Sequence, residues 1–287
     1  MNMKKGFTLI LTLVMAMALL AGCGGSSASK EEPKKAAAEI SGTVKASGST
    51  ALLPFLKAGQ EEFQKKNAKV TVNIAGGGSF TGQNQVASGA VNIGNSDVAL
   101  DPKLADKGLV EIKLVGIPFV FVAHKDVKVD NLATQQYVDI MTGKISNWKE
   151  VGGQDLKITL IHRAASSGSR ATIQELVLKT NKFTDNAVIQ DSNGAVRAAI
   201  GSTAGGFGYV DAAYVDATVK ALAVDGVQYS LNDVASGKYK ILTFGRMYTK
   251  GEPKDATKAF IDFVTGKEFQ EAYAEKNGFV PITKMPK

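Results

Sequence analysis

From Ile40 onward, short runs rich in β-branched residues alternate with segments whose apolar residues recur at helical spacing. This alternation is typical of α/β folds with a largely parallel sheet. Apolar spacing predicts helices near residues 52–65, 171–178 and 260–273. The expected strands cover residues 42–46, 69–74, 111–124, 157–162, 207–210 and 239–244.

One expected strand is apolar along most of its length and still contains a proline, Pro118, within the run 114–123. Such a segment is expected where a strand crosses from one sheet to another. A second crossing is expected near residues 242–248. Two crossings predict two lobes with a ligand cleft between them. The predicted lobes are residues 40–118 plus 246–287, and residues 119–245.

The N-terminus has the pattern of a secretory signal, because Lys4 and Lys5 precede an apolar run at 7–20 and the small residues Ala21 and Gly22 follow it. The run is about 14 residues long, which is too short to span a membrane comfortably. Residues 1–22 are therefore predicted to be a signal peptide. The segment Leu20-Ala21-Gly22-Cys23 resembles a bacterial lipobox, so Cys23 is predicted to carry a lipid that anchors the chain to a membrane. A buried core cysteine is the alternative reading.

Residues 23–39 are predicted to be a flexible tether behind the lipid, because they are mostly Gly, Ser, Ala, Lys and Glu without a packing pattern. Removal of Lys4 and Lys5 with the signal lowers the formal net charge from +7 to about +5. The lysines are scattered along the chain, which argues against a nucleic-acid partner. Small anions remain plausible partners.

Composition also limits the chemistry. The chain has one cysteine and two histidines, which excludes a disulfide framework and argues against a His/Cys zinc site or a His-based triad. Neither a Gly-x-Ser-x-Gly elbow nor a P-loop occurs. We therefore expect no catalytic residues, no metal and no cofactor, and His124 and His162 are interpreted as ordinary residues at strand ends.

Four turns rich in glycine and hydroxyl residues follow expected strands, and most precede a helix. A helix N-terminus offers unpaired N–H groups and a partial positive charge, so such turns bind oxyanions. A single one is more simply a helix cap, but four in an open α/β fold favour a site at the carboxyl ends of the strands. Two of the four arginines, Arg163 and Arg170, flank the last turn. The turns are residues 47–51, 76–82, 93–97 and 163–170.

These turns, together with residues 140–149 and 151–153, resemble the phosphate-binding lipoproteins of bacterial phosphate ABC transporters, the PstS-type solute-binding proteins. The resemblance covers about residues 40–287. It implies a two-lobe periplasmic-binding-protein-like α/β fold, with a two-strand hinge and an interlobe cleft that closes on one phosphate. It further implies a monomer that delivers phosphate to the permease subunits of an ABC transporter on the extracytoplasmic side of the membrane, in the periplasm or at the cell surface.

The same resemblance implies the roles of individual residues. Asp97 would be an acceptor and Arg163 a charge-assisted partner of the anion, while the others would supply hydroxyl or backbone donors. Many relatives have an acidic residue just after the arginine, where this chain has Ala164 and Ala165. The donor residues would be Ser49, Thr50, Ala51, Ser79, Ser167, Gly168 and Ser169.

Two other functions stay open at this stage. A receptor for sulfate, molybdate or tungstate would use the same donors, although an anionic Asp97 disfavours an oxyanion that carries no proton. A structural surface lipoprotein would need no converging donor turns. Trp148 is interpreted as a packing residue.

Overall fold

The computed structural model describes residues 40–285, which lie within one unit, Glu39–Lys287. The predicted signal peptide, Cys23 and the tether lie outside the described residues. The strands, in chain order, are β1 Gly42–Gly48, β2 Val70–Ala75, β3 Ile93–Ser96, β4 Leu109–His124, β5 Asn131–Leu132, β6 Thr159–Arg163, β7 Val188–Gln190, β8 Gly206–Asp211, β9 Val219–Ala221, β10 Ala223–Val224, β11 Leu242–Lys250 and β12 Val280–Pro281. The α-helices are α1 Leu53–Lys66, α2 Ser79–Ser88, α3 Thr134–Met141, α4 Gly168–Ile173, α5 Asn193–Ser202, α6 Leu231–Ala235, α7 Asp255–Thr265 and α8 Lys267–Tyr273.

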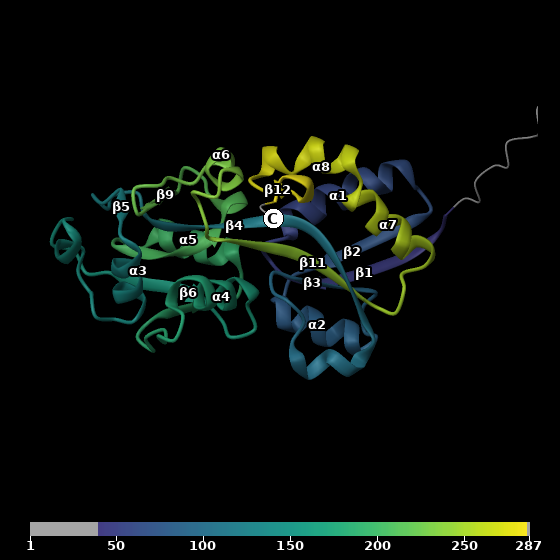
Figure 1. Ribbon diagram of the computed structural model, residues 1–287, viewed down its shortest axis with the longest axis horizontal. Coiled ribbons are helices and arrows are strands. Elements are labelled where there is room, and N and C mark those ends of the chain that lie inside the picture. The colour runs from purple at the N-terminus through teal and green to yellow at the C-terminus, as the bar shows by residue number, and fades with distance from the viewer. Residues whose placement is uncertain (1–39, 286–287) are drawn as a thin grey trace, which may run out of the picture. The chain divides into compact units, whose positions relative to one another are not determined.

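The main sheet is mixed, with the strand order β2-β1-β3-β11-β4-β8-β6-β7. In its first half, β1 pairs in parallel with β2 and β3, and β11 runs antiparallel to β3 and β4. Helices α1, α7 and α8 lie on one face of this half and α2 lies on the other (Figure 1). Because β1 and β3 are parallel, the segments that follow them emerge at the same edge of the sheet.

The second half of the sheet is built around β8, which pairs antiparallel with β4 and in parallel with β6. β6 also pairs in parallel with β7. Helix α5 packs on β8 and β6. The carboxyl ends of β6, β7 and β8 therefore also emerge together at one edge.

The long strand β4 links the two halves. Its residues up to Pro118 pair with β11, and its residues from Phe119 onward pair with β8. The register of β11 shifts between Gly245 and Arg246, while both sides of the shift still pair with β4. β4 therefore changes partner after residue 118, and the extents of the two lobes stay a prediction.

The expected strands appear with shifted ends, but one predicted turn was wrong. The sequence pattern predicts a turn at residues 93–97, whereas Ile93–Ser96 form β3 at the centre of the first half. Gly94 made this segment look like a turn, because glycine is more typical of turns than of strands. A Cβ there would lie 2.5 Å from the Gly82 carbonyl oxygen, so glycine is required for α2 to pack on the strand. The expected C-terminal helix near 260–273 is likewise divided at Gly266 into α7 and α8.

Two residues interpreted as structural are buried in the second half. The Trp148 side chain has no exposed surface, and its indole N–H donates to the Gly205 carbonyl at 3.0 Å. His162 in β6 is buried and stacks on Phe183, with 4.5 Å between the ring centroids. Both side chains therefore contribute to packing.

Candidate anion-binding site

Polar residues that follow β1, β3 and β6 meet where the two halves of the sheet approach each other. Ser49 and Thr50 follow β1, Asp97 follows β3, and Arg163 ends β6. All four are buried. Their convergence at the carboxyl ends of parallel strands is the arrangement in which open α/β sheets bind ligands.

Asp97 is the centre of this cluster. Its carboxylate accepts hydrogen bonds from the hydroxyls of Ser49, on its own half of the sheet, and Ser169, on the opposite half, the second at 3.1 Å. Its backbone N–H donates to Ser79 Oγ at 2.9 Å. Burial raises the pKa of Asp97 above its usual value, and the hydrogen bond from Ser49 and the charge of Arg163 oppose that rise.

Two side chains of β11 hold the backbone of Asp97. Its carbonyl oxygen accepts from Thr243 Oγ1 at 3.0 Å and from Arg246 Nη1 at 3.2 Å. The nearby helical turn Pro102–Lys107 is capped by Asp101 instead. Asp97 is therefore not the N-cap of this helical turn.

Arg163 is held by backbone carbonyls. Its Nη2 donates to the Asp191 carbonyl at 2.8 Å and its Nε donates to the Gln190 carbonyl at 3.3 Å. Burial lowers the pKa of Arg163 from its usual value, and the charge of Asp97 opposes this. The end of β7 thus orients the guanidinium in a chain that has alanine at positions 164 and 165.

The turn after β6 brings Gly168 close to the first half of the sheet. A Cβ on Gly168 would lie 2.1 Å from Ser79 Oγ and 3.0 Å from the Asp97 Cβ, so only glycine fits. Ser167 is the N-cap of α4, and its Oγ accepts from the Arg170 N–H at 3.2 Å. Its hydroxyl hydrogen is still available as a donor.

Of the other residues in the predicted turns, Ser79 and Ala51 are buried and Arg170 lies outside the cluster. Ser79 opens α2 and is fully buried, and Ala51 is buried in the turn between β1 and α1. Arg170 donates to the Arg163 carbonyl at 3.1 Å and lies over the Phe183 ring, 5.0 Å from its centroid. Arg170 therefore supports the turn from outside the cluster.

Sequence reasoning missed two residues of the cluster, Asn193 and Tyr214. The side-chain Nδ2 of Asn193 lies 3.2 Å from Thr50 Oγ1 and 3.4 Å from Ser169 Oγ. The Tyr214 hydroxyl donates to the Thr50 carbonyl at 2.6 Å. The signal for Asn193 was present, because Ser192-Asn193-Gly194 follows a strand and opens a helix like the turns that were recognised.

This cluster combines many hydrogen-bond donors with one carboxylate. A guanidinium and several hydroxyls suit an oxyanion, whereas a buried carboxylate beside an anion is tolerable only if the ligand carries a proton to share. The arrangement suits a protonated tetrahedral oxyanion. Among residues 40–285, no group of three or more His, Cys, Asp or Glu residues has metal-site geometry, and no helix is long and apolar enough to cross a membrane.

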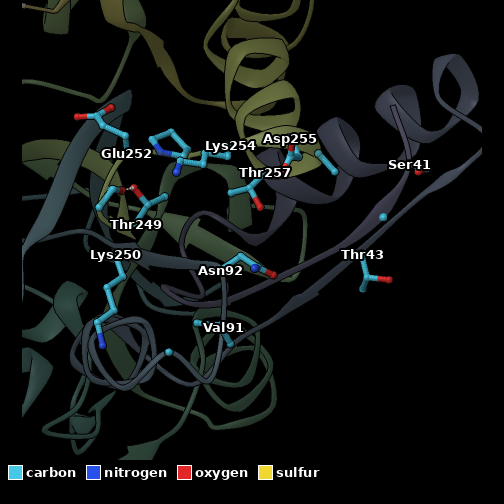
Figure 2. A pocket seen from close by; sticks show the side chains of 15 residues that line it. Ser41, Thr43, Val91, Asn92, Thr249, Lys250, Glu252, Lys254, Asp255 and Thr257 are labelled. Carbon is cyan, nitrogen blue, oxygen red and sulfur yellow. Dashed lines mark hydrogen bonds between the residues drawn. The ribbon is translucent and has the colours of Figure 1, made fainter. Parts of the chain in front are cut away.

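A cavity of about 670 Å³ lies at the amino end of β1, near the end of β11 and the start of α7 (Figure 2). This is the opposite end of β1 from the Asp97 cluster. Two of its polar side chains already have partners, because Thr249 donates to the Gly251 carbonyl and Asn92 accepts from the Lys45 N–H. We therefore do not assign the ligand site to this cavity.

Comparison with known proteins gives consistent matches. Residues 33–268 match the model of a PBP superfamily domain. The phosphate-binding protein PstS of Bacillus subtilis is 36% identical, with 99% of this chain and 96% of that protein covered. PstS of Borreliella burgdorferi is 28% identical, with 98% and 99% covered.

A comparison with solved structures points to the same family. A chain described as a phosphate ABC transporter substrate-binding protein from Clostridium perfringens, with bound phosphate, superposes with a TM-score of 0.80 and is 32% identical. The match covers 84% of this chain and all of that one. Together with the α/β fold and the buried Asp97 cluster, these similarities show that the chain belongs to the PstS-type phosphate-binding proteins of the PBP superfamily.

Proposed function

We propose that this protein binds inorganic phosphate outside the cytoplasm and delivers it to the permease subunits of an ABC transporter. The observation that carries the proposal is the buried carboxylate of Asp97, which accepts hydrogen bonds from donors on both halves of the sheet. Phosphate still carries a proton at neutral pH, and the Asp97 carboxylate can accept a hydrogen bond from that P–OH group. The names of the full-length relatives support the same ligand.

In this proposal, Arg163 supplies a charge-assisted hydrogen bond, and Asp97 accepts a hydrogen bond from the protonated oxygen of the anion. Ser49, Thr50 and Ser79 supply hydroxyl donors, with a backbone donor at Ala51. Ser167, Gly168 and Ser169 supply the donors of the opposite half. Burial of the cluster strengthens these interactions, because the surroundings screen charge less than water does.

A lipid on Cys23 would hold the protein on the extracytoplasmic face of a membrane, with residues 24–39 as the tether. This part of the proposal depends on the sequence pattern alone. We further propose that the protein acts as a monomer, since one chain supplies both halves of the Asp97 cluster.

Calorimetric titration of the mature protein with phosphate and with sulfate tests the proposal. We expect binding heat and a rise in melting temperature with phosphate only, since a ligand bound by the native state alone stabilises it. At 100 times the Kd the stabilisation is about 2.7 kcal/mol. Equal responses to both anions would favour a general oxyanion receptor, and no response to either would favour a structural role.

A further inference from the structure

Asn193 lies inside the candidate site although no recognised turn contains it. The residue opens α5 and its side chain is fully buried. Its Oδ1 accepts from the Asp211 N–H at 3.1 Å. Because an N–H group can only donate, this contact fixes which end of the amide is oxygen. The Nδ2 group therefore faces Thr50 and Ser169 as a donor of two hydrogens.

The hydroxyl of Thr50 receives two hydrogen bonds from this one residue. The backbone N–H of Asn193 lies 3.3 Å from Thr50 Oγ1, and Nδ2 lies 3.2 Å from the same atom. A hydroxyl has one hydrogen and two lone pairs, and these two contacts use both lone pairs. Toward a ligand, Thr50 can act only as a donor.

The hydroxyl of Ser169 is directed in the same way. Its Oγ accepts from Asn193 Nδ2 at 3.4 Å and from Arg163 Nη1 at 3.5 Å. Its own hydrogen is donated to Asp97 Oδ2 at 3.1 Å. Asn193 thus helps to set the direction of one hydroxyl on each half of the sheet.

We propose that Asn193 is a positioning residue that makes Thr50 an obligatory donor toward the ligand and keeps the Ser169 hydroxyl directed at Asp97, so that the site prefers the more ionised form of phosphate. The dianion offers more acceptor oxygens than the monoanion, and fixed donors need acceptors. This inference rests on the proposed binding of phosphate. Asn193 itself acts through the two hydroxyls.

The substitution Asn193→Asp tests this idea, because a carboxylate of the same shape accepts hydrogen bonds and has none to donate. The hydroxyl of Thr50 would then turn toward residue 193 and present a lone pair to the ligand, and the Ser169 hydroxyl would be drawn from Asp97 toward residue 193. We expect phosphate affinity to fall about 10- to 100-fold at about pH 8, the equivalent of one or two lost hydrogen bonds. At about pH 6 the loss should be several times smaller, because the monoanion brings an extra proton, and protonation of the introduced carboxyl group would restore a donor.

Other ionisable groups close to this position are Asp97, Arg163, Asp191, Arg197, Asp211 and Tyr214. They are shared by the parent and the variant. The difference between the two pH profiles of affinity therefore reports on residue 193 together with its coupling to these groups, and the uncharged Asn193→Ala variant removes that coupling. Asn232→Asp makes the same charge change at an exposed position in α6 and should leave the profile unchanged.

A second variant tests the same idea without adding a buried charge that could disturb folding. Asn193→Ala removes Nδ2 without adding charge, and we expect about a 3- to 10-fold loss at about pH 8 and a smaller loss at about pH 6. The melting temperature of each ligand-free variant checks the fold. Equal losses at both pH values in the folded variants would overturn the proposal and leave Asn193 with a packing role. Failure of the parent protein to bind phosphate would instead refute the proposed function.

Discussion

Replacing Asp97 by asparagine gives the most direct test of how the site selects its anion. Asparagine keeps the size of the side chain, removes the charge and adds an amide donor. In the structure the carboxylate accepts from Ser49 and Ser169 and is almost completely buried, with 1% of its surface exposed. A fully deprotonated sulfate would be repelled by this carboxylate and would accept a hydrogen bond from the amide.

The size of the effect follows from one hydrogen bond to a charged group, about 1.5 to 3 kcal/mol. Because about 1.4 kcal/mol is a factor of ten in affinity, we expect the ratio of phosphate to sulfate affinity to fall about 10- to 100-fold. The ligand-free protein should change little in stability, within about 1 kcal/mol, since losing accepted hydrogen bonds is offset by removing a charge that burial disfavours.

Calorimetric titration with each anion measures the ratio, and denaturant unfolding measures the stability. Asp155→Asn is the control, because it removes an exposed carboxylate in the loop before β6, away from the Asp97 cluster. If the ratio in Asp97→Asn equals that of the parent while the control behaves normally, Asp97 has a structural role. The argument for selectivity then fails.

Three further predictions concern the second half of the sheet. Arg163→Lys keeps the charge but loses the planar fork, and calorimetry should show about 1 to 3 kcal/mol of lost phosphate binding; unchanged affinity would mean that Arg163 does not contact the ligand. Ser167→Ala should cost about 1 kcal/mol of binding by the same measurement, since one neutral donor is lost, and a loss as large as that at Arg163 would contradict this ranking. Burial lowers the pKa of His162 to about 4 from 6.5, so the unfolded state takes up a proton first as the pH falls. Unfolding free energy should therefore drop by up to about 3 kcal/mol between about pH 6.5 and about pH 4, and denaturant titrations of a His162→Phe control should lack this part of the drop.

Much of the fold and site could be predicted from local pattern. The alternation of strand and helix segments predicted the α/β class, and turns rich in glycine and hydroxyl residues marked the ends of β1 and β6 together with Ser79. These signals are local, because propensity, capping and helix N-terminal chemistry depend on residues a few positions apart. Arg163 stood out because arginine is rare in a chain rich in lysine.

The tertiary structure decided what depends on contacts between distant residues. β3 is a strand because it pairs with β1 and β11, and Gly94 lets α2 pack closely on it. The carbonyls of Gln190 and Asp191 orient Arg163 across 27 and 28 positions. Asn193 reaches Thr50 across 143 positions, which no local pattern records. Hydrogen-bond direction in the buried cluster depends on which donors and acceptors the fold brings together, and a sequence specifies that only through the complete chain.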